Sequence, residues 1–152
     1  MRQALSEARK CTHVPTAFCV GCVIVVYPDE QGIVLSTGYS RELAGNTHAE
    51  ANALQKARML QTIPRSSTLS TLLHTASVYT TLEPCSVRTS GLAPCANALV
   101  DAGVKEVIIG VKEPDDFVTC EGVKVLRDGG VEVKWVKGLE EECLRVARGV
   151  FD

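Results

Sequence analysis

The stretch SVYTTLEPCSVRTSGLAPCANALVDAG (residues 77–103) combines a strand pattern, a polar loop and a helix pattern, and it decides the fold. Its first six residues, 77–82, are rich in β-branched and aromatic side chains, which favours a buried strand. Residues 94–103 begin with proline and end with glycine, as short helices often do. The apolar run EVIIGV (106–111) predicts the next strand. A strand, a helix and a strand in this order predict parallel strands joined by a right-handed crossover.

The alternation of strands and helices extends to both ends of the chain. Upstream, GCVIVVY (21–27) and IVLSTGY (33–39) predict an antiparallel hairpin, because the turn sequence PDEQG separates the two apolar runs. Alanine and leucine recur at helical spacing within 45–60, where Thr47 and Glu50 form the capping-box pattern with Thr47 as the N-cap. The other expected elements are helices over 2–10, 121–130 and 138–151, a strand over 131–136, and a surface loop over the Ser- and Thr-rich residues 61–76.

The composition is typical of one globular domain. The chain has 152 residues, of which 45% are hydrophobic and 22% charged, with a net charge of −2 and a pI of about 5.9. We expect a single α/β domain over 1–152 with a five-stranded mixed sheet, in which the hairpin is antiparallel and the later strands are parallel. The acidic balance argues against a nucleic-acid partner, because nucleic-acid-binding domains usually carry a basic excess.

The sequence contains no pattern of a membrane or exported protein. Its apolar runs are shorter than the roughly 18 residues that a membrane span needs. The N-terminal sequence MRQALSEARKC carries both charge signs and lacks an apolar signal core. We therefore expect a cytoplasmic protein with no membrane partner. Its seven cysteines should be reduced, so each is expected to be buried or bound to a metal.

Four residues in separate segments predict a zinc site. His48 and Glu50 open one expected helix. Cys85 follows a strand, and Cys95 opens the next helix. Two thiolates and one imidazole suit zinc, and three protein ligands leave the fourth position to water, as in catalytic sites. Glu50 lies at the very start of its helix, so it can reach a group bound to the metal and is expected to move protons as the catalytic acid–base.

Each of these residues alone also has a more ordinary interpretation. A histidine near a helix start is more often a cap or a polar contact, and a buried free cysteine is common. Asp115 and Asp116 could contact a substrate or cap a loop. The other five cysteines are interpreted as packing residues: Cys11, Cys19, Cys22, Cys120 and Cys143.

The combination of His-Ala-Glu, Thr-Leu-Glu-Pro-Cys and Pro-Cys resembles the zinc nucleobase deaminases. In that pattern two residues separate the cysteines, whereas nine separate Cys85 and Cys95. From about residue 15 to the end, the chain resembles the deaminase domain of riboflavin biosynthesis. The resemblance rests on the long gap and on the segments VGCVIV, HAEANAL, TLEPCS, APCANALVDAGVKEVIIGVKEPDD and EGVKVLRDGGVEV. GNTHAE (45–50) and CSVRTSG (85–91) are more similar to its fungal branch.

Three departures separate the chain from the bacterial members of that family, one of which is Ser90-Gly91-Leu92-Ala93-Pro94-Cys95 in place of a Gly-Lys/Arg-Thr-Pro-Pro-Cys ending. Bacterial members carry Pro-Asn-Pro before Val-Gly-Cys, where this chain has Thr16-Ala17-Phe18. They also carry a histidine after Cys-Ser, where this chain has Val87. These departures are consistent with a substrate whose sugar form differs from the bacterial one.

The resemblance implies a fold, a cofactor and a reaction. The fold is the three-layer α/β/α cytidine deaminase-like one, with one Zn²⁺ per chain, and relatives commonly form homodimers. The reaction is hydrolytic deamination of 2,5-diamino-6-ribitylamino-4(3H)-pyrimidinone 5′-phosphate to 5-amino-6-ribitylaminouracil 5′-phosphate and ammonia. Bacterial relatives act on the unreduced ribosyl compound. A small phosphorylated pyrimidine is therefore the expected partner.

The segment between the two cysteines is expected to bind the substrate phosphate. It contains Arg88, Thr89 and Ser90, and a guanidinium beside hydroxyl groups suits phosphate binding. The alternative for Arg88 is a solvated loop residue. Ser40 ends the second expected strand, where the wider superfamily often places a polar substrate contact.

Two other functions stay open on the sequence alone. One is a different zinc deaminase, acting on the ribosyl form, a free base, a nucleotide or tRNA. The other is a non-catalytic, zinc-stabilised interaction module. The acidic balance argues against tRNA, and the long loop between the cysteines argues against a free base. A structural zinc site would normally supply a fourth protein ligand, which argues against the module.

Overall fold

Strands and helices alternate along the computed structural model, which describes residues 1–63, 68–116 and 119–151. The elements are α1 (Arg2–Ala8), β1 (Gly21–Val26), β2 (Ile33–Tyr39), α2 (Ala49–Arg58), α3 (Leu69–Leu73), β3 (Ser77–Leu82), α4 (Cys95–Ala102), β4 (Glu106–Val111), α5 (Gly122–Asp128), β5 (Glu132–Trp135) and α6 (Glu140–Ala147). All five expected strands are present, and their ends differ from the expected bounds by one residue at most.

The five strands form one mixed sheet in the order β2-β1-β3-β4-β5. β1 pairs antiparallel with β2 and with β3, whereas β3, β4 and β5 are parallel. Cys22 of β1 therefore lies between Gly38 of β2 and Thr80 of β3. The start of β1 and the carboxyl ends of β2, β3 and β4 meet at one edge of the sheet. Ligands of open α/β sheets bind outside the carboxyl ends of the strands, so this edge is where a site is expected.

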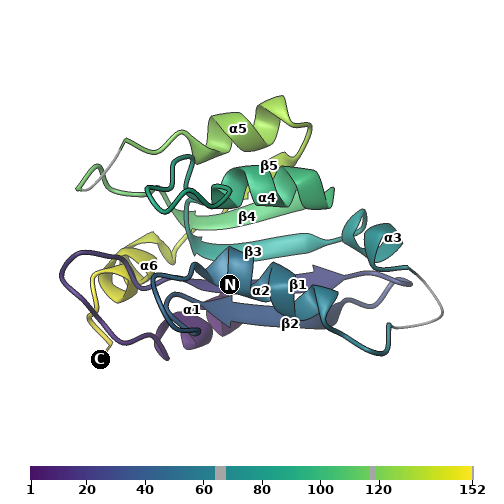
Figure 1. The fold of residues 1–152 in the computed structure, drawn as a ribbon, viewed down its shortest axis with the longest axis horizontal. Coiled ribbons are helices and arrows are strands. Elements are labelled where there is room, and N and C mark those ends of the chain that lie inside the picture. Colours follow the sequence, from purple (N-terminus) through teal and green to yellow (C-terminus); the bar gives the residue numbers. More distant parts are fainter. Residues whose placement is uncertain (64–67, 117–118, 152) are drawn as a thin grey trace.

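Helices cover both faces of the sheet (Figure 1). On one face α2 packs on β1 and β2 and contacts α4, which in turn contacts α5. On the other face α1 and α6 contact each other and the central strands. The larger apolar core, with Ile24, Leu54 and Leu99, lies under α2 and α4, and a smaller one, with Leu5 and Cys143, lies under α1 and α6. The expected three-layer α/β/α fold is thereby confirmed.

No helix within the three described ranges has both the length and the apolar character needed to cross a lipid bilayer. The longest helix that carries part of the site, α2, spans Ala49–Arg58 and presents one face to the sheet. Helices of this length serve here to cover the sheet and to direct their first turns at its edge.

The expected surface loop over 61–76 is wrong in its second half. Leu69–Leu73 form α3, and the Thr68 side chain caps this helix by accepting a hydrogen bond from the Thr71 N–H at 3.1 Å. Leu72 and Leu73 are buried against the larger core. The Ser- and Thr-rich composition obscured these leucines, whose burial stabilises a helix too short to persist alone. Residues 64–67 lie outside the described residues.

The start of α2 also differs from the expectation. The N-cap is His48, not Thr47, and its side chain makes no capping hydrogen bond. The Thr47 hydroxyl instead accepts hydrogen bonds from the Leu43 N–H and the Asn52 side-chain amide, at 3.3 and 3.0 Å. The expected capping box is therefore wrong, because the side chain of Glu50 bonds elsewhere, as described below.

The first turns of α2 lie directly on β2 because Gly38 has no side chain. A Cβ atom at this position would lie 2.2 Å from the carbonyl oxygen of Ala49 and 2.7 Å from the backbone nitrogen of Ala53. Both of these atoms belong to the helix backbone, so they cannot move aside without moving the helix. The close approach fixes the distance between the start of α2 and the sheet. It thereby also fixes the positions of His48 and Glu50.

We predict that Gly38→Ala lowers the free energy of unfolding by roughly 2–3 kcal/mol, because overpacking forces backbone shifts. Gly32→Ala is the matched control, since the three atoms nearest to a Cβ there belong to the side chains of Tyr27 and Val25 and not to the backbone. We expect the control to change the free energy of unfolding by less than about 1 kcal/mol. Urea denaturation of both variants measures the difference. Equal effects of the two substitutions would contradict a close helix–strand contact at Gly38.

Candidate metal centre and active-site cavity

Two helix N-termini and one strand end converge at the edge of the sheet described above. His48 precedes α2, Cys85 follows β3, and Cys95 is the first residue of α4. The extended backbone of His48, with φ −101° and ψ 149°, turns its ring away from the helix. The backbone N–H of Cys95 donates to the Cys85 sulfur at 3.3 Å, which ties the start of α4 to the end of β3.

The three side chains form a cluster with the dimensions of a zinc site. His48 Nδ1 lies 3.5 Å from the Cys85 Sγ and 3.5 Å from the Cys95 Sγ. All three ligand atoms lie within 4.8 Å of one another. In a tetrahedral site with Zn–N of about 2.0 Å and Zn–S of about 2.3 Å, nitrogen and sulfur are roughly 3.6 Å apart. The residues therefore fit one zinc ion, and the donor set is the one expected from the sequence.

The electrostatics of the two cysteines favour a metal-binding thiolate. A hydrogen bond from the Cys95 thiol, supported by His48 and the Cys95 N–H, lowers the pKa of Cys85 to about 4. The same shared proton, followed by burial, raises the pKa of Cys95. The pair thus holds one proton between two sulfurs, and a divalent cation between them would displace that proton.

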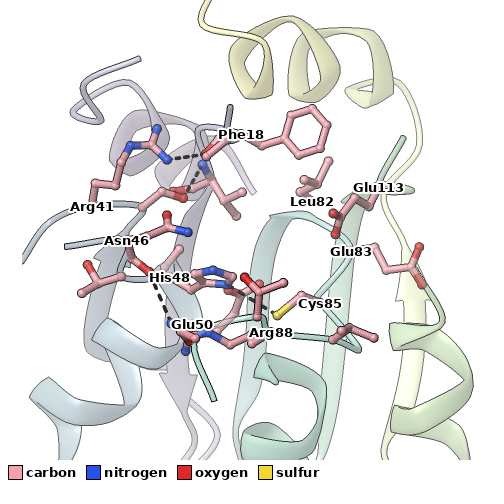
Figure 2. A pocket seen from close by; sticks show the side chains of 18 of the residues that line it. Phe18, Arg41, Asn46, His48, Glu50, Leu82, Glu83, Cys85, Arg88 and Glu113 are labelled. Carbon is pink, nitrogen blue, oxygen red and sulfur yellow. Dashed lines mark hydrogen bonds between the residues drawn. The ribbon is translucent and has the colours of Figure 1, made fainter. Parts of the chain in front are cut away.

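Glu50 lies in the first turn of α2, beside the cluster (Figure 2). Its side chain is almost fully buried, and its Oε1 accepts a hydrogen bond from the Thr80 hydroxyl at 2.8 Å. Burial, followed by the charge of Cys85, raises the pKa of Glu50. A carboxyl group whose pKa is raised in this way suits proton transfer at neutral pH. Thr80 was missed by the sequence analysis, because only the pairing of β3 with β1 brings it to Glu50.

A cavity of about 310 Å³ opens above the cluster and Glu50. This volume accommodates a small-molecule ligand. Its wall contains seven of the eight predicted site residues: Ser40, His48, Glu50, Cys85, Arg88, Thr89 and Ser90. The eighth, Cys95, is buried beneath the cavity. Residues 16–18, which depart from the bacterial pattern, also line the cavity.

The predicted substrate-contact residues differ in how far their hydrogen-bonding groups are already bonded within the protein. The Arg88 guanidinium donates to the Asn46 carbonyl oxygen at 3.3 Å and is half-buried, whereas Thr89 and Ser90 are exposed at the rim. Ser40 is buried, and its hydroxyl accepts the N–H of Val20 at 3.0 Å. Arg88 therefore retains donors that a ligand could use, while Ser40 is engaged in holding the start of β1.

Arg41 holds one wall of the cavity in place, a role that the sequence did not suggest. It has a left-handed backbone with φ 60°, which brings its side chain back over the N-terminal segment. Its guanidinium donates to the carbonyl oxygens of Thr12 and Phe18, each at 3.1 Å, and to the sulfurs of Cys11 and Cys19 at 2.8 and 3.3 Å. These bonds fix the segment that carries residues 16–18.

An acidic pair forms another part of the cavity wall. Glu83 and Glu113 are both buried and both line the cavity, yet neither was predicted as a site residue. The available signal was Glu-Pro, which occurs once directly after β3 and once shortly after β4. Asp115 and Asp116 do not line the cavity and are exposed, and Asp116 pairs with Arg148 at 2.9 Å.

The cysteines outside the cluster agree with their interpretation as packing residues. All seven cysteines are free thiols and all are buried. Burial raises the pKa of Cys11 to about 12, and burial also raises the pKa of Cys120 to about 12. These thiols stay protonated at neutral pH, so they do not compete with Cys85 for a metal ion.

Comparisons with known proteins agree with this site. Residues 1–111 match the family described as the cytidine and deoxycytidylate deaminase zinc-binding region. The chain is 44% identical over 147 residues to the diaminohydroxyphosphoribosylamino-pyrimidine deaminase of Schizosaccharomyces pombe, covering 97% of this chain and 34% of that protein. The chain thus spans about a third of the length of the curated relatives it matches.

Solved structures show the same fold. The Aspergillus oryzae Rib2 deaminase, a C-terminal deletion mutant, superposes with a TM-score of 0.79 at 34% identity, covering 98% of this chain and 89% of that one. A second structure of that enzyme, in complex with DARIPP, gives a TM-score of 0.78 at 34% identity and covers 98% and 88%. With its matching residues, its fold and its cluster of one histidine and two cysteines, the chain belongs to the zinc-binding cytidine and deoxycytidylate deaminase family.

Proposed function

We propose that residues 1–152 form one hydrolytic deaminase domain of riboflavin biosynthesis, which converts 2,5-diamino-6-ribitylamino-4(3H)-pyrimidinone 5′-phosphate to 5-amino-6-ribitylaminouracil 5′-phosphate and ammonia. The observation that carries the proposal is the position of Glu50 in the same cavity as His48 and Cys85. The name of the Schizosaccharomyces pombe relative and the complex of the Aspergillus oryzae enzyme with DARIPP support a phosphorylated pyrimidine substrate.

The reaction adds water to the amino-bearing ring carbon and expels ammonia, so one C–O bond forms and one C–N bond breaks. His48, Cys85 and Cys95 would hold a zinc ion, which would supply a water nucleophile that ionises near neutral pH. Glu50 accepts one proton of the attacking water and passes it to the ring nitrogen, and then transfers the remaining hydroxyl proton to the amino group, which leaves as ammonia. The Thr80 hydroxyl holds the Glu50 carboxylate in one orientation during these transfers.

The loop between the two cysteine ligands binds the substrate phosphate in this proposal. Arg88 is half-buried at the cavity wall, and the hydroxyls of Thr89 and Ser90 lie at the rim. A guanidinium can donate two parallel hydrogen bonds to a phosphate, which gives both affinity and orientation. Ser40 contributes to this binding site indirectly, because its hydroxyl holds the backbone of Val20 next to the start of β1. A homodimer and a cytoplasmic location stay predictions of the sequence.

We predict that Glu50→Gln lowers kcat for ammonia release by at least roughly 10²–10⁴-fold, because the amide cannot accept and return the proton. The variant keeps its zinc, since Glu50 is not a ligand. Glu141→Gln, on the exposed surface of α6, is the control and should keep the wild-type rate. A Glu50→Gln enzyme with one zinc ion and a nearly normal rate would remove Glu50 from the mechanism.

We predict that Arg88→Ala lowers kcat/KM for the phosphorylated substrate by roughly 10–100-fold, chiefly through KM, because a hydrogen bond to a charged group is lost. The same substitution should have little effect on the dephosphorylated substrate, which has no partner for Arg88. Arg58→Ala, exposed in the last turn of α2, is the matched control. An unchanged KM for the phosphorylated compound would show that Arg88 does not bind the phosphate.

A further inference from the structure

Glu113 is a buried carboxyl group at the cavity wall that the proposed mechanism does not use. It follows β4 by two residues, at the carboxyl end of the parallel strands, and is 9% exposed. Figure 2 shows it beside Leu82 and near Glu83. Glu113 lines the same cavity as Cys85 and Glu50.

Within the part of the chain that the structure describes, the carboxyl group of Glu113 has acceptor capacity to spare. Among the described residues, no lysine or arginine forms an ion pair with its carboxyl group, and the nearby Cys120 thiol donates its hydrogen bond to the Pro84 carbonyl oxygen at 3.4 Å. Burial, followed by the charge of Cys85, raises the pKa of Glu113 to about 7. Buried carboxyl groups are normally paired, so a group that faces a cavity with acceptor capacity to spare calls for an external partner.

The adjacent Glu83 strengthens the acidic character of this wall. Its Oε1 accepts the N–H of Val123 at 3.0 Å, while its Oε2 is buried without a partner among the described residues. Two neighbouring carboxyl groups attract donors and repel phosphate. The cationic Arg88 lies in the same cavity wall, on a loop whose tip is exposed. The cavity therefore has an acidic, buried part and a cationic part that reaches the rim.

We propose that Glu113 is a specificity-determining residue, whose carboxyl group accepts a hydrogen bond from the ring amino group that deamination leaves in place. This inference rests on the proposed function. The flat ring has to enter the buried part of the cavity to reach Glu50, while the phosphate stays at the rim with Arg88. The retained amino group is on the ring carbon opposite the reacting one, so in this proposal it points away from Glu50 and toward the wall that carries Glu113, and its N–H groups are the donors that a carboxyl group binds.

The position of Glu113 is held by contacts that do not involve its carboxyl group. The ion pair between Asp116 and Arg148 anchors the loop after β4 to the end of α6. Val111 pairs with Leu82 at the ends of the two parallel strands. Glu113→Gln should therefore leave the loop in place while it removes the charge, weakens the remaining acceptor and turns the other oxygen into an NH2 donor.

The test compares two substrates of the purified protein by ammonia release. One is the ribityl diaminopyrimidinone phosphate, and the other is its analogue with hydrogen in place of the 5-amino group. Glu113→Ala should lower kcat/KM for the first by roughly 10–100-fold, because a charged acceptor is lost. On the analogue it should lower kcat/KM by less than about threefold. Glu113→Gln keeps a neutral acceptor and should lose roughly 3–10-fold on the first substrate only.

Asp115→Asn is the control, since Asp115 is exposed on the same loop and does not line the cavity. Zinc content and the melting temperature are measured for every variant, and Glu113→Gln, of equal size, carries the test if Glu113→Ala does not fold. Equal losses on both substrates, or no loss on either, overturn the role of Glu113 and leave the proposed function intact. If the wild-type protein releases no ammonia from either compound, the proposed function fails and this inference fails with it.

Discussion

The convergence of His48 Nδ1 with the sulfurs of Cys85 and Cys95, at 3.5 Å each, is the constraint on which the site depends. Its three atoms come from the starts of two helices and the end of one strand, so small shifts of any of these elements would separate them. Gly38 lets α2 approach the sheet, and the Cys95 N–H bonds the sulfur of Cys85. The packing that stabilises the fold is therefore also what preorganises the metal ligands, since such sites need their geometry held by the scaffold.

In the proposed function, the residues that do the chemistry lie deeper in the cavity than the residues that bind the phosphate. Glu50 and its partner Thr80 are buried, which strengthens their electrostatic interactions and holds the proton-transfer group in one orientation. The polar loop of Arg88 reaches the rim, where a phosphate can keep part of its hydration. The nine residues between the cysteines thus place the segment proposed to bind phosphate next to the cluster of His48, Cys85 and Cys95.

Much of this arrangement could be predicted from local patterns. The apolar runs predict the strands correctly, and the proline and glycine at the ends of 94–103 predict the helix between them. Both patterns depend on residues that are close in the sequence. The expected loop over 61–76 is wrong where α3 forms, since burial of its leucines depends on the distant core. The capping box at Thr47 is wrong because His48 is extended toward the cluster. Glu113 was missed for a similar reason, since its place at the cavity follows from the parallel pairing of β4 with β3.

The central claim is that this cluster supports zinc-dependent deamination of a ribityl pyrimidine phosphate. Ammonia release from the ribityl and ribosyl forms, measured before metal removal, after it and after addition of one equivalent of zinc, tests that claim most directly. We predict a kcat/KM at least about tenfold higher for the ribityl form, lost with the metal and restored by zinc. Release that persists without metal, or no release from the ribityl form with zinc bound, would contradict the account.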